Sequence, residues 1–237
     1  MLVPRFRREA GIDVKVIAVG SGAALRMAAR GDADVVLAHA PSAERDFVKA
    51  GDLVEGRLVM HNDFVLVGPP GDPAGVKGSA SVEAAMAAIA RAGGFASRGD
   101  DSGTHKKELE LWGAAGFDPK SVARREEIGQ GMGATLRVAS ERGLYTLTDR
   151  GTYLTQGRRL RLVVVYQGAT ILLNVYHAHL VNPAKHAGVK AAAGRRFIEF
   201  LVSGDVQRTI GEFGKAQFGE PLFVPDANKD PTTLGLR

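Results

Sequence analysis

Residues 94–104 read Gly-Phe-Ala-Ser-Arg-Gly-Asp-Asp-Ser-Gly-Thr, and this stretch carries the pattern that decides the fold. Gly94 to Ser97 predicts a short strand, and Ser102 to Ala115 predicts a helix in which Lys106 and Glu110 lie four residues apart. A turn of glycine, aspartate and serine therefore links a strand to a helix. The same succession recurs along the chain, which is typical of an α/β fold.

Hydrophobic periodicity predicts further strands and helices on both sides of this unit. The predicted strands span residues 13–19, 35–38, 63–68, 144–147, 160–167 and 171–181. The other predicted helices span residues 21–30, 42–50, 82–92, a stretch ending at Arg142, and 190–213 with a break at Ser203-Gly204-Asp205. We expect mixed, mainly parallel sheets flanked by helices.

The length of the chain and two candidate crossing points predict two lobes. The 237 residues, 45% of them hydrophobic, are enough for two domains of roughly 100 residues each. The chain can pass between lobes near Asp63 to Val67 and again near Tyr166 to Tyr176. Lobe one then comprises residues 1–65 with 177–237, and lobe two comprises residues 66–176.

Composition argues against a nucleic-acid-binding protein, a membrane-spanning protein and a protein with thiolate chemistry. The net charge of +5 comes from scattered bases, and aromatic residues are only 6% of the chain, which disfavours nucleic-acid binding. The longest apolar stretch, Leu160 to Val181, is interrupted by polar residues and is not expected to cross a membrane. Residues 1–8 lack the apolar core of a secretion signal. The absence of cysteine excludes disulfides and thiolate chemistry.

Glycine, serine and threonine cluster where predicted strands lead into helices. Helix N-termini carry unpaired N–H groups and a partial positive charge, so several of them facing one crevice form an anion site. The clusters span residues 20–22, 98–104, 129–133 and 146–152. An alternative is that Ser21, Ser102 and Thr148 are ordinary helix caps.

Arg98 precedes its helix by a few residues, where a guanidinium can form two parallel hydrogen bonds to an oxyanion. The alternative role for Arg98 is a surface salt bridge with Asp100 or Asp101. Thr104 either donates its hydroxyl from the first helical turn or is a half-exposed helix residue.

No catalytic set can be assembled from the sequence. His105 has no second histidine at metal-ligand spacing, and His177 and His179 alternate on a predicted strand, which favours packing or a solvated edge. The Gly20 turn lacks a nucleophile elbow, and residues 129–134 lack the lysine of a P-loop. We therefore predict no enzyme, no catalytic residue, no metal site and no cofactor.

Five blocks of sequence resemble the tungstate-binding proteins of ABC importers, and a sixth resembles the closing helix of type II periplasmic binding proteins. The five are residues 16–22, 30–35, 61–69, 97–108 and 145–153, and the sixth is residues 197–203. The resemblance covers nearly the whole chain and is most specific over residues 97–108. Relative to the family pattern, the chain begins after the first strand and its threonine- and serine-rich turn.

The resemblance implies two α/β lobes of the type II periplasmic-binding-protein-like fold, with an oxyanion between them. By position, Arg98 and Thr104 resemble ligands from lobe two, and Ser21 and Gly22 resemble donors from lobe one. The full expected ligand set is Ser21, Gly22, Arg98, Ser102, Gly103, Thr104, Thr146 and Thr148. The resemblance also implies that the protein binds tungstate or molybdate and delivers it to a membrane permease. It is expected to be a monomer that is periplasmic or anchored outside the cytoplasm.

The sequence is compatible with a second function and with a second anion. The same fold also serves as a ligand-sensing regulatory domain, so an oxyanion- or metabolite-sensing role is the alternative function. Tungstate offers only hydrogen-bond acceptors, whereas protonated phosphate also needs an acceptor such as Asp100, Asp101 or Asp149. We expect those aspartates instead to cap helices or to orient Arg98.

Overall fold

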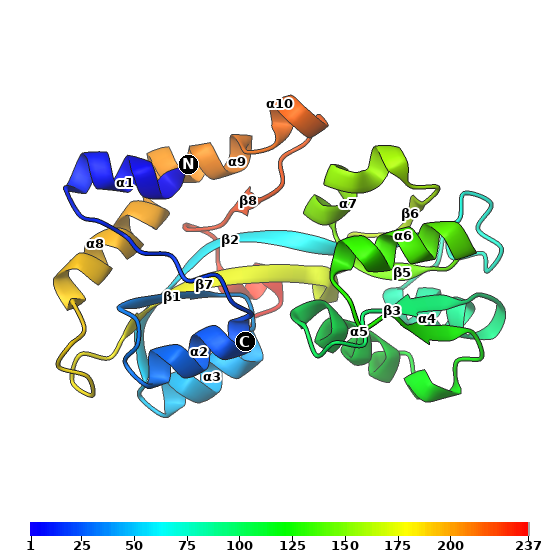
Figure 1. Ribbon diagram of the computed structural model, residues 1–237, viewed down its shortest axis with the longest axis horizontal. Coiled ribbons are helices and arrows are strands. Elements are labelled where there is room, and N and C mark those ends of the chain that lie inside the picture. Colours follow the sequence, from blue (N-terminus) through cyan, green and yellow to red (C-terminus); the bar gives the residue numbers. More distant parts are fainter. Residues whose placement is uncertain (237) are drawn as a thin grey trace. The chain divides into compact units, whose positions relative to one another are not determined.

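The computed structural model describes residues 1–236 and divides into two compact units (Figure 1). Unit 1 contains Met1–His61 and Asn174–Arg237, and unit 2 contains Asn62–Leu173. Helices and strands occur together in both units, so the predicted α/β class is confirmed. None of the helices among the described residues is long and apolar enough to cross a membrane.

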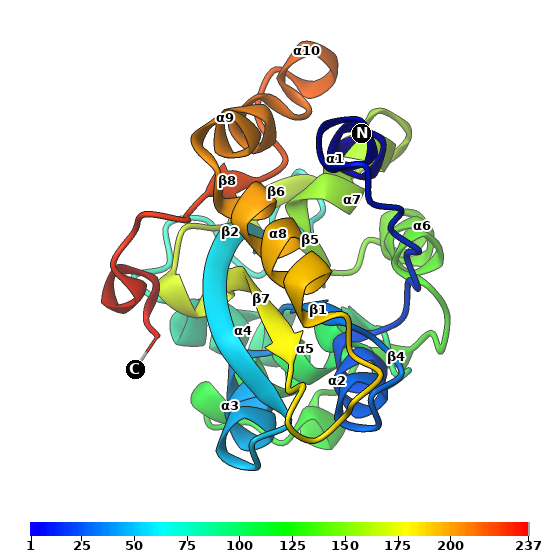
Figure 2. The same ribbon diagram turned by 90° about the vertical axis from the view of Figure 1, so that its left-hand side faces the viewer.

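Unit 1 is a sheet with helices on both faces. α2 (Ser21–Ala29) and α3 (Pro41–Lys49) lie on one face, and α1 (Leu2–Ala10), α8 (Ala191–Val202) and α9 (Gly204–Glu212) lie on the other (Figures 1 and 2). The sheet contains β1 (Val35–Ala38), β7 (Leu173–Val181), the first part of β2 (Leu53–Gly68) and β8 (Val224–Pro225). α10 (Lys215–Phe218) and the short 3-10 helix η4 (Pro231–Leu234) complete the unit.

Side chains that alternate along these strands point to opposite faces of the sheet and form two apolar layers. One layer joins Leu25 and Ala28 of α2 to Val36 of β1, and the other joins Leu180 of β7 to Ile198 of α8. Burying one such leucine or isoleucine side chain contributes about 1.5–3 kcal/mol, so the layers fix the faces of β1 and β7.

Unit 2 is built around the second part of β2, which pairs with β5 (Thr146–Asp149) and β6 (Val163–Tyr166). A smaller sheet joins β3 (Phe95–Ser97) to β4 (Arg125–Glu127). The α-helices are α4 (Val82–Ala92), α5 (Gly103–Ala114), α6 (Met132–Arg142) and α7 (Arg150–Gln156). Short 3-10 helices are η1 (Pro119–Ser121), η2 (Gly157–Arg159) and η3 (Thr170–Leu172).

The core of unit 2 also has two layers. Trp112 of α5 packs edge-on against Phe95 of β3, with ring centroids 5.2 Å apart, in the layer that also holds Met86 of α4. Leu136 of α6 packs with Val65 of β2 in the second layer. β3 and β5 therefore end at fixed positions, and the turns that follow them are held by the core.

Parallel and antiparallel pairs both occur, as predicted, but the pairs that have a described register are mainly antiparallel and not mainly parallel. β1–β7, β2–β5, β2–β6 and β2–β8 are antiparallel, while β3–β4 and the bridge between Phe95 and Tyr145 are parallel. Helices that alternate with strands in sequence do not tell which strands become neighbours. Here β2 is a single strand of 16 residues that takes partners from distant parts of the chain.

Residues 13–19, predicted as a strand, form no strand in the structure. Val16 is 67% exposed and Ile17 is 50% exposed, so the alternation of apolar residues does not reflect a buried face. A strand needs a neighbour to satisfy its backbone N–H and C=O groups. Within residues 1–236 no strand pairs with this segment.

Candidate functional site

The turn between β3 and α5 in unit 2 contains four of the predicted ligand residues: Arg98, Ser102, Gly103 and Thr104. Gly99 has a φ of 58°, and a Cβ at this position would lie 2.9 Å from the Cβ of Glu127. Only glycine fits such a left-handed, crowded position without strain. The sequence Arg-Gly-Asp-Asp-Ser thus folds back tightly and places Arg98 beside the start of α5.

Arg98 is held by two internal partners and keeps spare donor capacity. Its Nε donates to the carbonyl of Gln130 at 2.9 Å, and its Nη2 donates to the carboxylate of Asp100. Its side chain is only 13% exposed. Among the described residues, Nη1 has no hydrogen-bond partner. The guanidinium is therefore fixed in place with an unused pair of N–H donors.

Asp100 carries out the orienting role predicted for it. Besides pairing with Arg98, its Oδ1 accepts from the backbone N–H of Ser102 at 3.2 Å. Burial alone raises the pKa of Asp100, but hydrogen bonds from Ser102 and Arg98 outweigh it and lower the pKa below its ordinary value. Asp149 similarly caps α7 by accepting from Thr152 N at 2.8 Å. Asp100 and Asp149 are used internally, as expected, whereas in the described part of the chain the exposed carboxylate of Asp101 lies 3.6 Å from Lys106 Nζ and neither caps a helix nor orients Arg98.

The first turn of α5 offers further donors. Ser102 is the helix cap, because its Oγ accepts from the backbone N–H of His105 at 3.3 Å. Gly103 and Thr104 follow, where backbone N–H groups lack partners within the helix. Among the described residues, the Thr104 hydroxyl has no hydrogen-bond partner. Arg98 and Thr104 thus both retain donors at the same end of α5.

Thr146 and Thr148 differ from this group because both are buried in β5. The Thr146 hydroxyl donates to the carbonyl of Ala96 at 2.7 Å, and the Thr148 hydroxyl donates to the carbonyl of Asp149 at 3.1 Å. Each hydroxyl hydrogen is already engaged by the backbone. The structure therefore favours a framework role for these two side chains, and their role as ligands stays a prediction.

Ser21 and Gly22 begin α2 in unit 1. The helix has no side-chain cap at Gly20, so the N–H groups of its first turn keep their donor capacity. Ser21 Oγ accepts from the backbone N–H of His39 at 3.3 Å and leaves its own hydrogen available. Ser21 and Gly22 lie in unit 1, and the other six predicted ligand residues lie in unit 2.

Two polar residues near the start of α2 were not predicted from the sequence: His39, whose backbone N–H contacts Ser21, and its partner Asn174. His39 follows β1, and its Nδ1 lies 2.8 Å from Oδ1 of Asn174, which is 7% exposed. The signal was present in the sequence, since residues 38–41 form another junction between a strand and a helix. This junction differs from the predicted clusters because it contains no glycine or threonine.

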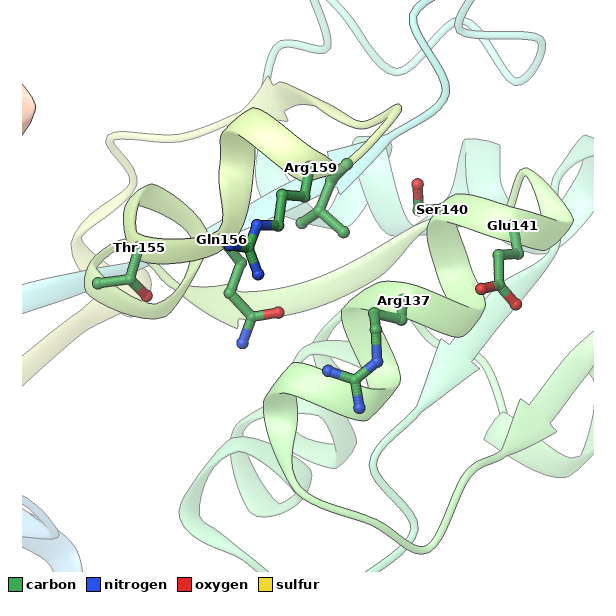
Figure 3. Close-up of a pocket in the computed structure, with 7 residues that line it drawn as sticks. Arg137, Ser140, Glu141, Thr155, Gln156 and Arg159 are labelled. Carbon is green, nitrogen blue, oxygen red and sulfur yellow. The ribbon is translucent and has the colours of Figure 1, made fainter.

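A pocket of about 390 Å³ lies in unit 2 between α6 and α7 (Figure 3). Its lining includes Arg137 and Arg159, together with Glu141. None of the predicted ligand residues lines it. The pocket therefore does not correspond to the anion site expected from the sequence.

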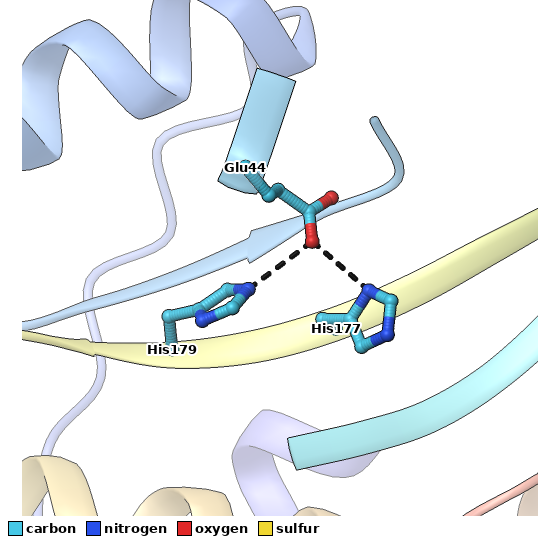
Figure 4. Close-up of side chains that lie close together, drawn as sticks. All are labelled: Glu44, His177 and His179. Carbon is cyan, nitrogen blue, oxygen red and sulfur yellow. Dashed lines mark hydrogen bonds and ion pairs between the residues drawn. The ribbon is translucent and has the colours of Figure 1, made fainter. Parts of the chain in front are cut away.

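Unit 1 also contains a buried group that the sequence reasoning did not assemble. Glu44 of α3 meets His177 and His179 of β7 through one carboxylate oxygen (Figure 4). Burial opposes ionisation of Glu44, but hydrogen bonds from His177, His179 and Ala40 outweigh it and lower the pKa to about 2. The alternation of the two histidines is visible in the sequence, whereas no sequence pattern links Glu44 to them.

Comparison with known proteins identifies the family. The model of the PBP superfamily domain matches residues 1–205. The tungstate-binding protein TupA of Peptoclostridium acidaminophilum is 44% identical over 231 residues, which cover 96% of this chain and 80% of that protein.

Two solved structures are also similar over most of their length. The tungstate-binding protein TupA from Desulfovibrio alaskensis G20 has a TM-score of 0.88 at 43% identity, covering 96% of this chain and 92% of that one. The tungstate ABC transporter structure from Geobacter sulfurreducens has a TM-score of 0.77 at 43% identity, covering 90% of each chain. The chain belongs to the PBP superfamily, in the same family as these tungstate-binding proteins, which are binding proteins and not enzymes.

Proposed function

We propose that this protein is the substrate-binding component of an ABC importer and that its substrate is tungstate, with molybdate as the second candidate. The names of its relatives support this role, since they include tungstate-binding proteins and a tungstate ABC transporter. The observation that carries the proposal is the Arg98 turn, where a fixed guanidinium keeps two donors free. Charge-assisted hydrogen bonds of this kind are the strong ones in oxyanion recognition.

The balance of donors and acceptors favours a fully deprotonated oxyanion. Arg98 Nη1, the Thr104 hydroxyl and the first N–H groups of α5 are donors. Both carboxylate oxygens of Asp100 accept from Arg98 and Ser102, Asp149 Oδ1 accepts from Thr152, and the exposed Asp101 carboxylate lies 3.6 Å from Lys106 Nζ. Protonated phosphate would bring an O–H group that needs an acceptor, while tungstate and molybdate bring none.

We assign the principal ligand role to Arg98, Gly103 and Thr104, with Ser102, Ser21 and Gly22 as further ligands. Thr146 and Thr148 are proposed to support the turn from β5. Ser21 and Gly22 add neutral donors from the first turn of α2. Neutral donors suit a dianion because the ligand already has the Arg98 charge as a partner.

The same proposal implies partners and a location. Import requires a membrane permease that receives the oxyanion, and we expect the protein to act outside the cytoplasm, as a periplasmic or membrane-anchored monomer. Size-exclusion chromatography with light scattering tests the monomeric state directly.

A thermal melt with tungstate, molybdate, sulfate and phosphate at equal ionic strength tests the proposed function. Ligand at about a thousand times its dissociation constant should stabilise the protein by roughly 4 kcal/mol. We expect clear shifts in the melting temperature with tungstate and molybdate and none with phosphate, while sulfate, which also offers only acceptors, tests whether the site distinguishes oxyanions by size. A shift with phosphate and none with tungstate would overturn the assignment, because it would place an available acceptor in the site.

A further inference from the structure

The cluster of Glu44, His177 and His179 lies within unit 1 and contains none of the residues proposed to bind the oxyanion (Figure 4). His177 and His179 are two residues apart on β7, so their side chains project from the same face of the strand. Glu44 comes from α3, which lies over that face. The fold thus supplies the third group that the spacing of the histidines alone lacked.

The three side chains converge at metal-ligand spacing. Oε2 of Glu44 lies 2.9 Å from Nδ1 of His177 and 3.1 Å from Nε2 of His179. All three ligand atoms lie within 4.8 Å of one another. Zinc binds imidazole nitrogen and carboxylate oxygen at about 2.0–2.2 Å, so neighbouring ligands of a tetrahedral ion lie about 3.3 Å apart. An ion therefore fits among these atoms after small side-chain movements.

The surroundings favour an ion over a simple hydrogen-bonded group. The Glu44 side chain is 4% exposed, and its Oε1 is anchored by the backbone N–H of Ala40 at 2.7 Å. This anchor leaves Oε2 turned toward the imidazoles. Nδ1 of His177 is buried and has only the Glu44 carboxylate beside it, at 2.9 Å and in imperfect hydrogen-bond geometry. A buried polar atom with an imperfect hydrogen bond is costly, and a metal–nitrogen bond would satisfy it better.

We propose that Glu44, His177 and His179 form a binding site for a divalent first-row transition metal ion, with Zn²⁺ as the best-suited ion. Two imidazoles and a carboxylate are the ligand types that zinc accepts. The three protein ligands leave a fourth position for water, reached past His177, whose side chain is 17% exposed. The ion links α3 to β7 and stabilises unit 1.

Zinc binding is measured by competition with a chromophoric chelator, using the full chain after dialysis against a chelating agent. We expect one site per chain in the unaltered protein. Glu44→Gln and His177→Gln should each weaken Zn²⁺ binding by more than about 100-fold, which exceeds the usual cost of losing an outer-shell partner. Glutamine at position 44 keeps an oxygen to accept from Ala40, so the fold is expected to survive.

His61→Gln is the matched control, because His61 also pairs with a carboxylate in unit 1, lying 2.6 Å from Asp226, but among the described residues it belongs to no metal-capable group of three side chains. Its zinc affinity should equal that of the unaltered protein. Zinc K-edge X-ray absorption of the bound protein should show two imidazole ligands. If the unaltered protein binds zinc no more tightly than Glu44→Gln, or if His61→Gln loses as much affinity, the cluster is only a buried hydrogen-bonded group and the proposal is wrong.

Discussion

The Arg98 turn of unit 2 and the Glu44 cluster of unit 1 are both built on a charged side chain that is largely buried, yet they present opposite chemistry. Arg98 gives Nε and Nη2 to internal partners and keeps the donors of Nη1. Oε1 of Glu44 accepts from a backbone N–H, and Oε2 lies beside two imidazoles. One region can receive an anion, whereas the other can receive a cation.

The difference shows that the donors and acceptors left over after internal hydrogen bonding determine which ligand a site can bind. The net charge of +5 does not distinguish the two regions. Each charged group has a fixing contact that also limits its rotation, so the remaining donors or acceptors point in one direction. A preorganised group loses little conformational entropy when a ligand binds.

Removing the guanidinium at Arg98 should give the largest effect. Hydrogen bonds to charged groups contribute about 1.5–3 kcal/mol, so Arg98→Ala should weaken tungstate binding by about 10- to 100-fold, measured by isothermal titration calorimetry. Zinc binding should be unchanged, because Arg98 lies in unit 2 and the Glu44 cluster lies in unit 1.

Two variants control this result. Arg124→Ala removes an exposed arginine of the same unit and should leave tungstate affinity unaltered, which excludes an effect of net charge. Glu44→Gln should reverse the pattern by lowering zinc affinity and sparing tungstate affinity. If Arg98→Ala lowers both affinities, the two regions are not independent and the comparison fails.

The packing of Tyr145 against the turn at Asp72 and Ala74 in unit 2 is tested by Tyr145→Phe. The buried Tyr145 hydroxyl donates to Asp72 Oδ1 at 2.8 Å and accepts from Ala74 N at 3.0 Å. Its loss leaves the N–H of Ala74 without its partner, and we expect a decrease of about 1–3 kcal/mol in the free energy of unfolding at pH 7, measured by urea denaturation.

The pH dependence of this decrease identifies its cause. Burial, with a contribution from Asp72, raises the pKa of Tyr145 to about 12. A raised folded-state pKa stabilises the protein fully below the ordinary value near 10 and loses this contribution as the pH rises toward 12. The difference between the unaltered protein and Tyr145→Phe should therefore shrink between pH 10 and 12. A constant difference would contradict a role for the ionisable hydroxyl.

The cap of α5 provides a smaller test. Ser102→Ala removes the acceptor for His105 N and should lower the free energy of unfolding by about 1 kcal/mol. Ser102→Asp restores a capping oxygen but places a negative charge at the helix start. We expect it to recover stability in a thermal melt and to lose tungstate affinity. Recovery of both would place the oxyanion away from this turn.

Sequence patterns predicted the parts of the molecule that depend on local structure. The junction at residues 97–104 was identified because its glycine and serine meet local backbone requirements, and the role of Asp100 followed from its position two residues after Arg98. Antiparallel pairing of β2 was not predictable, because it depends on which distant segments meet. The Glu44 cluster was not predictable for the same reason, since Glu44 and His177 lie 133 positions apart along the chain.

Replacing Asp100 with asparagine gives a small effect on tungstate affinity, because two consequences oppose each other. Asparagine at position 100 would keep one oxygen but lose the charge that holds Arg98 Nη2, so Arg98 becomes less restrained. Removal of a negative charge also makes the site more attractive to a dianion. We expect the loss of orientation to dominate and tungstate affinity to fall by about three- to tenfold, or less than about 1.4 kcal/mol. Calorimetry at low and high ionic strength separates the two consequences, because salt screens the charge effect and leaves the loss of orientation. An increase in affinity that vanishes in high salt would mean that charge, and not fixed geometry, decides what the Arg98 turn binds.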